Sequence, residues 1–204
     1  MTTVAKTSNP LSARKTPGLN GRFYYFMRRL LVKALSPARL RCVGRRLVPD
    51  CGPALLAPNH VSWLDVVPVG SLFRRPVRFA ASRNLFDRNG DLLSGATRAL
   101  LEGDPLCIFP EGRLRKRDRA MRFKLGTARI LTHLSAEESL DVPTFPVAIR
   151  GTVGLIYPAK PVRVRIGPPI YFADFAGDSR IGEAMRAFTE RLTRNVRDMP
   201  RAMG

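Results

Sequence analysis

The stretch LLAPNHVSWLD, residues 55–65, decides how this sequence folds and where its polar groups gather. It begins with a short apolar run, which is consistent with a buried strand. His60 follows that strand directly, and a carboxylate, Asp65, comes five residues later. A second block, residues 107–113, repeats this design: it continues an apolar strand predicted at 105–109 and ends in the residues FPEGR. Because open α/β folds place their sites at strand ends, we expect both blocks at one edge of a sheet.

The rest of the chain alternates short apolar runs with stretches of helical periodicity. We expect further strands at residues 77–81, 143–149 and 162–166, and helices at 61–73, 92–102, 120–134 and 181–196. Within 162–166, apolar residues alternate with Arg163 and Arg165, which predicts one wet face and a position at or near the sheet edge. The sequence therefore predicts an α/β fold: a single layered domain with a mixed, largely parallel sheet flanked by helices, plus an N-terminal amphipathic helical element.

Length and composition limit the class of protein. With 204 residues, 45% of them apolar, the chain is long enough for one well-packed domain. The formal net charge of +19 favours partners that carry negative charge: nucleic acid, an anionic membrane surface or a phosphate-bearing substrate. Three cysteines without CxxC spacing indicate reduced thiols in a cytosolic setting. No run of apolar residues is long enough to predict a membrane-spanning helix.

The N-terminal part differs in composition from the rest. Residues 1–20 are polar, which predicts a flexible tail, and the absence of Asp and Glu before Asp50 also fits an organelle transit peptide. Residues 22–35 carry an apolar stripe at helical spacing, opposite several cations. Such a helix can lie in a bilayer interface or pack on the domain, and both interpretations stay open. We expect a tail (1–20), an amphipathic membrane-docking helix with a basic connector (21–48) and the α/β domain (49–204).

Several catalytic classes have no support in the sequence. The chain contains no GxSxG elbow, no GxxxxGK[ST] phosphate loop and no GxGxxG fingerprint. Its two histidines are 73 positions apart and its cysteines are scattered, so no metal site is recognisable. The pair His60 and Asp65 remains as the candidate for chemistry.

The spacing of His60 and Asp65 allows two interpretations. If His60 lies in the loop before a helix and Asp65 in its first turn, the carboxylate can reach one imidazole nitrogen. The other nitrogen is then free to accept a proton, which predicts a general base. The alternative is that Asp65 only caps the helix together with Ser62, while His60 is hydrogen-bonded to the backbone.

The second block adds groups that suit an anionic ligand. Gly112 allows a ligand to approach the backbone closely, and the guanidinium group of Arg113 can bind phosphate oxygens in pairs. The basic residues between positions 115 and 119 fit a solvated loop. Arg88, just before an Asn-Gly turn, is a third candidate for ligand contact.

Together these blocks resemble the glycerolipid acyltransferase family, in particular the 1-acylglycerol-3-phosphate (lysophosphatidate) acyltransferases. Residues 59–65 match the NHxxxxD motif of that family, residues 109–112 its FPEG motif, and residues 123–126 the FKxG that follows. Residues 146–149, with the sequence PVAI, and residues 165–170, with the sequence RIGPPI, resemble its two downstream motifs.

The resemblance implies transfer of a fatty acyl group from an acyl-CoA or acyl-carrier-protein thioester to a hydroxyl group. It implies that His60 takes the proton from that hydroxyl, that Asp65 orients His60 and that no acyl-enzyme forms. The residues implied to hold the glycerol phosphate are Arg88, Glu111, Gly112, Arg113 and Lys124. No cofactor is implied beyond the acyl-CoA or acyl-carrier protein that serves as co-substrate.

The same resemblance sets expectations about partners and location. The expected partners are a lysophospholipid acceptor, the acyl donor and an anionic membrane surface, with no nucleic acid. The expected location is peripheral, on the cytoplasmic face of a membrane, which in a bacterium is the inner membrane.

The chain departs from the family pattern in two ways. The segment between the two main motifs is shorter than usual, and Arg113 stands where the family has threonine. Both changes affect recognition of the acceptor, so another lysophospholipid or the lyso form of an ornithine lipid is an alternative acceptor. A lesser alternative is a non-catalytic basic module for nucleic acid or anionic lipid. Against it, the aromatic residues at 23–26 lie in one predicted helix and do not alternate with cations across a sheet.

Overall fold

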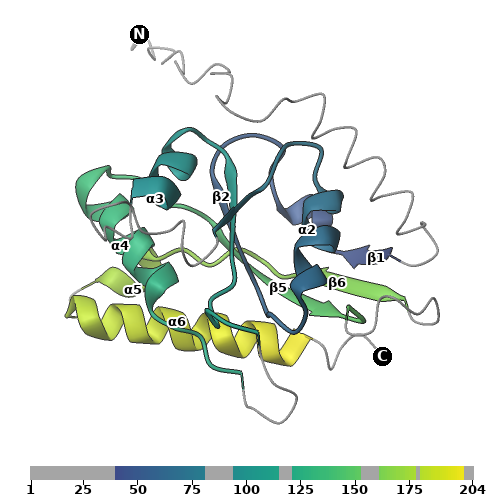
Figure 1. Cartoon of the computed structure of the whole chain (residues 1–204). Helices are drawn as coiled ribbons and strands as arrows, with labels where there is room; N and C mark the ends of the chain where they lie inside the picture. The colour runs from purple at the N-terminus through teal and green to yellow at the C-terminus, as the bar shows by residue number, and fades with distance from the viewer. Residues whose placement is uncertain (1–39, 81–93, 115–120, 153–160, 178–179, 200–204) are drawn as a thin grey trace, which may run out of the picture.

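The computed structural model describes residues 40–80, 94–114, 121–152, 161–177 and 180–199 (Figure 1). These residues form a six-stranded sheet with the strand order β1-β6-β5-β2-β4-β3. The strands are β1 (Leu40–Val43), β2 (Ala54–Pro58), β3 (Arg78–Ala80), β4 (Pro105–Ile108), β5 (Thr144–Arg150) and β6 (Val162–Ile166). The helices are η1 (Arg45–Leu47), η2 (Trp63–Asp65), α2 (Val66–Leu72), α3 (Ser94–Leu101), α4 (Gly126–Glu137), α5 (Ala173–Ala176) and α6 (Ile181–Asp198). The predicted α/β fold with a mixed, largely parallel sheet is confirmed.

The strand directions determine which segments meet at each edge of the sheet. Strands β3, β4, β2 and β5 are parallel, so their carboxyl ends lie at one edge. Strand β6 pairs antiparallel with β5, and β1 is parallel to β6. The amino ends of β6 and β1 therefore lie at the edge where β2 and β5 end. As predicted, β6 is next to the outermost strand on its side of the sheet.

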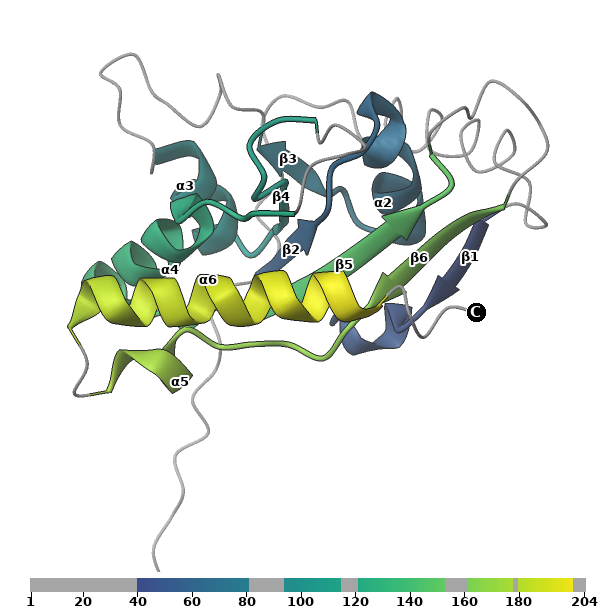
Figure 2. The same cartoon turned by 90° about the horizontal axis from the view of Figure 1, so that it is seen from below.

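Helices cover both faces of the sheet, which explains the continuous apolar runs in its central strands. Leu55 and Ala57 of β2 pack on the face of α3, α4 and α6, whereas the neighbouring Leu56 packs on the face of α2. Figure 2 shows α6 and α2 on opposite sides of the sheet. The largest fully buried side chains, Phe73, Phe145 and Phe188, lie in the cores of these two faces.

One segment of the structure differs from the prediction at the start of the domain. Residues up to 48 are predicted to form a connector, but Leu40–Val43 form the strand β1, which pairs in parallel with β6. Its sequence, LRCV, places Leu40 and Cys42 against the core while Arg41 points away. The basic composition of this region conceals the two-residue alternation of a short edge strand.

Helix α4 begins later than predicted. The sequence predicts a helix from residue 120, but α4 starts at Gly126. Before it, the backbone N–H of Lys124 donates to the carbonyl of Pro110, at 2.9 Å. This contact with the chain that follows β4 keeps the residues before Gly126 out of the helix. The short helix α5 was also not predicted.

Several expectations fall on residues outside the described ranges. They are the tail at 1–20, the amphipathic helix at 22–35 and the candidate Arg88. Among the helices that the structure describes, none combines the length and the apolar character needed to cross a bilayer.

Candidate active site

The side chain of Asn59 fixes the point where the chain leaves the sheet. Its Oδ1 accepts the backbone N–H of Ile149 at 2.7 Å, and its Nδ2 donates to the carbonyl of Ile149 at 3.1 Å. The backbone N–H of Asn59 also donates to the carbonyl of Val147, at 3.3 Å. The amide thus continues the pairing of β2 with β5 for one more residue after β2 ends at Pro58. His60 follows at a position that both strands determine.

The turn after His60 brings Asp65 back to the imidazole. The ring nitrogen Nδ1 of His60 lies 3.0 Å from Oδ2 of Asp65. The same oxygen accepts the backbone N–H groups of Val61, at 2.8 Å, and Ser62, at 2.9 Å. The hydroxyl of Ser62 accepts the N–H of Leu64, which completes a capping box at the start of η2. Asp65 therefore caps the helix and also contacts the imidazole, so the interpretation that Asp65 only caps the helix is wrong.

Thr152 completes the surroundings of Asp65. Its hydroxyl donates to Oδ1 of Asp65 at 2.6 Å, across 87 residues of sequence, and both side chains are fully buried. Oδ1 thus receives a hydroxyl donor, while Oδ2 faces the imidazole and two backbone N–H groups. The sequence alone does not point to Thr152. Only the pairing of β2 with β5 points to Thr152, because this residue follows β5 at the edge of the sheet where His60 follows β2.

The hydrogen bonds of Asp65 define the tautomer of His60. An ionised carboxylate can only accept hydrogen bonds, so Nδ1 of the imidazole carries the proton that points at Asp65. In the neutral ring, Nε2 is then the unprotonated nitrogen and can accept a proton. Within the described residues, Nε2 has no hydrogen-bond partner, and the His60 side chain is 17% exposed. The geometry is that of a general base and its orienting carboxylate.

The second sequence block holds His60 from the other side. The Phe109 ring stacks on the imidazole, with 4.0 Å between the ring centroids and an angle of 23° between the planes. Oε1 of Glu111 accepts the backbone N–H of His60 at 2.9 Å, and only 6% of Glu111 is exposed. The prediction that the ends of β2 and β4 meet at one edge is confirmed. Glu111 supports the position of His60, a role that the sequence did not suggest.

Two of the residues predicted to hold a phosphate lie together beside this site. Gly112 has a φ of +67°, a conformation that suits glycine, and its N–H donates to the carbonyl of Phe109 at 3.0 Å. A Cβ atom at Gly112 would lie 2.9 Å from Nζ of Lys124, so the lysine side chain runs along this turn. Arg113 is exposed at the next position. Arg88, the remaining candidate, lies outside the described residues.

A cysteine is buried under the site but is not suited to act as a nucleophile. Burial of Cys107 on β4 raises the pKa of its thiol well above its usual range, and the Asp65 carboxylate adds to this shift. The thiol therefore stays protonated near neutral pH. Covalent chemistry at Cys107 is not expected, because the thiolate is the nucleophilic form.

Replacing Thr152 with valine keeps its shape and removes the donor to Oδ1 of Asp65. We expect a loss of about 1–3 kcal/mol in the free energy of unfolding, because a buried carboxylate oxygen is left without that hydrogen bond. Urea unfolding measures the change. Thr132→Val is a matched control, since among the described residues the Thr132 hydroxyl bonds only to the carbonyl of Ala128 within α4. Equal losses in the two variants would contradict the assigned role of Thr152.

Comparison with solved structures supports the architecture. The chain is similar to the crystal structure of the 1-acyl-sn-glycerophosphate (LPA) acyltransferase PlsC from Thermotoga maritima, with a TM-score of 0.60 and 21% sequence identity. The match covers 87% of this chain and 78% of that one. At this level of identity the likeness establishes the fold. A comparison with the curated proteins finds no match.

The family model described as Acyltransferase matches two overlapping segments of the chain, residues 39–90 and 86–150. Together they span more than half of the sequence and include both blocks that meet at His60. The resemblance noted from the sequence motifs is thereby confirmed at the level of the family. The chain belongs to the acyltransferase family and is an enzyme that transfers acyl groups.

Proposed function

We propose that this enzyme transfers a fatty acyl group to the free hydroxyl of 1-acylglycerol-3-phosphate, giving phosphatidate. The donor in this proposal is the thioester of acyl-CoA or of acyl-carrier protein. The observation that carries the proposal is the hydrogen bond between Nδ1 of His60 and Asp65, which leaves Nε2 to accept a proton, beside a turn that carries cations. The neighbouring structure from Thermotoga maritima, a lysophosphatidate acyltransferase, supports the choice of acceptor.

The proposed reaction is a direct displacement at the thioester carbonyl. Nε2 of His60 removes the proton from the acceptor hydroxyl as its oxygen bonds to the carbonyl carbon. The carbon–sulfur bond then breaks, and the proton on the imidazolium passes to the leaving thiolate. Asp65 stabilises the imidazolium while it exists, and general-base assistance of this kind is worth about 10²- to 10⁴-fold in rate. The acyl group never bonds to the enzyme.

The second block supplies groups for the acceptor phosphate. The ammonium group of Lys124 lies beside Gly112, and the exposed guanidinium group of Arg113 follows in the chain. We propose that these cations, with Arg88, bind the phosphate oxygens while Glu111 holds the His60 loop. The same chemistry on another lysophospholipid, or on the lyso form of an ornithine lipid, is the alternative for the acceptor. The proposal needs neither a cofactor nor a metal.

The lipid acceptor also suggests a location. We propose a peripheral enzyme on the cytoplasmic face of a membrane, attached through the amphipathic helix predicted at residues 22–35. The net charge of +19 fits an anionic bilayer surface in this proposal. Nucleic acid is not part of it.

The variant His60→Gln is expected to lower turnover by about 10²- to 10⁴-fold, because the general base is lost. The measurement is release of free thiol from acyl-CoA in the presence of lysophosphatidate. The chain offers one matched control, His133→Gln, since His133 lies in α4 and takes no part in the site. Full activity in the His60 variant would eliminate the mechanism. Transfer to other lysolipids but not to lysophosphatidate would replace the proposed acceptor.

Removing a cation proposed to bind the phosphate is expected to weaken binding of the acceptor more than it slows the chemical step. In Lys124→Gln or Arg113→Gln, we expect the KM for lysophosphatidate to rise about tenfold or more while kcat changes little, since each loses a charge-assisted hydrogen bond worth about 1.5–3 kcal/mol. Steady-state kinetics with a varied acceptor give both constants. Arg122→Gln removes an exposed charge nearby and serves as the control. An equal rise in KM for all three variants would indicate a general charge effect and contradict the assignment.

A further inference from the structure

Three arginines lie side by side across the outer strands of the sheet. Arg41 of β1 is paired with Arg163 of β6, and Arg163 is paired with Arg150 of β5. Directly paired residues of adjacent strands point to the same face, so their side chains form one row about 10 Å long, two strand spacings. Arg165, two residues further along β6, adds a fourth. We call these four residues, Arg41, Arg150, Arg163 and Arg165, the arginine face.

The arginine face points away from α2. The alternate residues of the same strands, such as Leu40, Val164 and Ile149, belong to the core on the α2 side. The arginines therefore point to the side of the sheet where α6 lies. Figure 2 shows that β6 and β1 extend beyond the carboxyl end of α6, so this helix leaves their outer part open.

The positive charge of this face is not balanced by its own strands. Strands β1, β5 and β6 contain no Asp or Glu. Like charges placed directly opposite each other destabilise a sheet, so the side chains of Arg41 and Arg150, on either side of Arg163, have an electrostatic cost when no anion is nearby. Arg41 and Arg150 are both exposed, and within the described residues neither forms an ion pair or a hydrogen bond. An external anion would lower this cost.

The row of arginines starts next to the active site. Arg150 ends β5, two residues before the Thr152 that bonds to Asp65. From there the row runs outward along the same edge of the sheet to Arg41. The single tryptophan, Trp63, is 68% exposed only three residues after His60, and Val43, on the arginine side of β1, is 62% exposed. Val43 is paired with Arg165, so an exposed apolar side chain lies beside guanidinium groups on this face, a combination that fits the interface of a bilayer, where phosphates and apolar groups lie close together.

We propose that the arginine face binds the headgroups of an anionic phospholipid bilayer, and that it sets the orientation in which the active site meets the membrane. The proposal rests on the proposed function, because it concerns a lipid acceptor supplied by the bilayer. Guanidinium groups bind phosphate oxygens in pairs, and each arginine near an anionic surface contributes about fivefold to partition. The arginine face shares no residue with the amphipathic helix predicted at 22–35.

The test uses the full chain and the double variant Arg41→Gln/Arg150→Gln. These two arginines are chosen because both are exposed and unpaired in the described structure, so their loss leaves the fold intact. Cosedimentation with phosphatidylglycerol-containing vesicles measures partition. We expect binding to fall about 10- to 30-fold, with little change for vesicles of phosphatidylcholine alone. Turnover of short-chain substrates dispersed in water is expected to stay unchanged.

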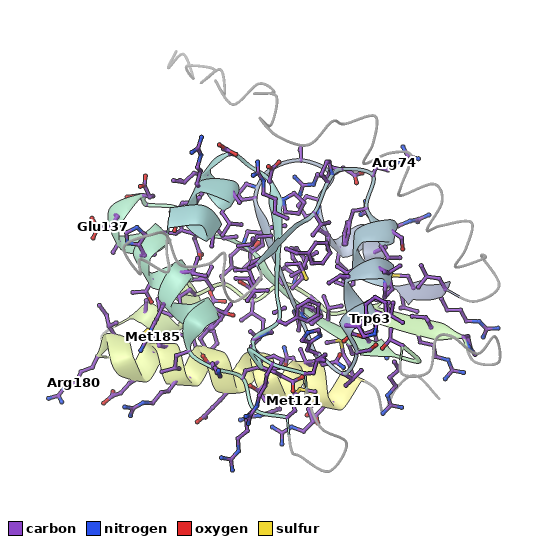
Figure 3. The ribbon with its side chains drawn as sticks, in the orientation of Figure 1. Trp63, Arg74, Met121, Glu137, Arg180 and Met185 are labelled. Carbon is purple, nitrogen blue, oxygen red and sulfur yellow. The ribbon has the colours of Figure 1, made fainter. Side chains whose placement is uncertain are left out.

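A matched control removes two charges from the other end of the molecule. The double variant Arg180→Gln/Arg186→Gln has the same net charge, and Figure 3 shows Arg180 and the neighbouring Met185 far from Trp63. We expect its vesicle binding to fall less than threefold. Equal losses in both double variants, or no loss in either, would overturn the arginine face as a docking surface. If Arg41→Gln/Arg150→Gln loses binding to DNA but keeps binding to vesicles, the arginine face is a nucleic-acid surface and the proposal is overturned.

The outcomes also separate this proposal from the proposed function. If the wild-type chain acylates no lysolipid but its vesicle binding still depends on Arg41 and Arg150, the docking surface stands and the proposed function fails. If the wild-type chain acylates lysophosphatidate and the arginine variant binds vesicles normally, the enzyme assignment stands and the docking surface fails.

Discussion

The buried carboxylate of Asp65 is the constraint on which the rest of the site depends. A buried charge costs several kcal/mol unless its hydrogen bonds are satisfied. Asp65 meets this condition through the imidazole, two backbone N–H groups of its own turn and the hydroxyl of Thr152. Its donors come from the turn after β2 and from the end of β5, so the carboxylate is satisfied only when these two strands are correctly paired. Correct pairing of β2 with β5 and the orientation of His60 therefore depend on each other.

The three central strands, β2, β4 and β5, together position His60. Strand β2 leads into it, β5 anchors Asn59 and leads to Thr152, and β4 provides the chain that carries Phe109 and Glu111. Because these strands are parallel, their carboxyl ends lie at the same edge of the sheet. The outer strands β6 and β1 run the other way, which places the amino ends of both at the same edge. This reversal brings arginines of the outer strands next to the edge where His60 lies.

Local patterns made part of this arrangement predictable. The runs at residues 54–58 and 105–108 are apolar without alternation because both faces of these strands are covered, so they could be recognised as buried strands. The contact of His60 with Asp65 followed from the short turn and the cap at Ser62. Thr152 could not be found in this way, since only the pairing of β2 with β5 brings it to Asp65. The arginine face is likewise hidden in the sequence, because Arg41, Arg150 and Arg163 become neighbours only through strand register.

The position of the proton on the His60 ring distinguishes a general base from a histidine with a purely structural role. Nitrogen NMR of the full chain distinguishes Nδ1 from Nε2, and the His133→Gln variant leaves His60 as the only histidine to assign. In the neutral ring we expect the proton on Nδ1, where Asp65 accepts it, and an unprotonated Nε2. Finding the proton on Nε2 would contradict the proposed mechanism, because the nitrogen proposed to receive the acceptor's proton would already be occupied.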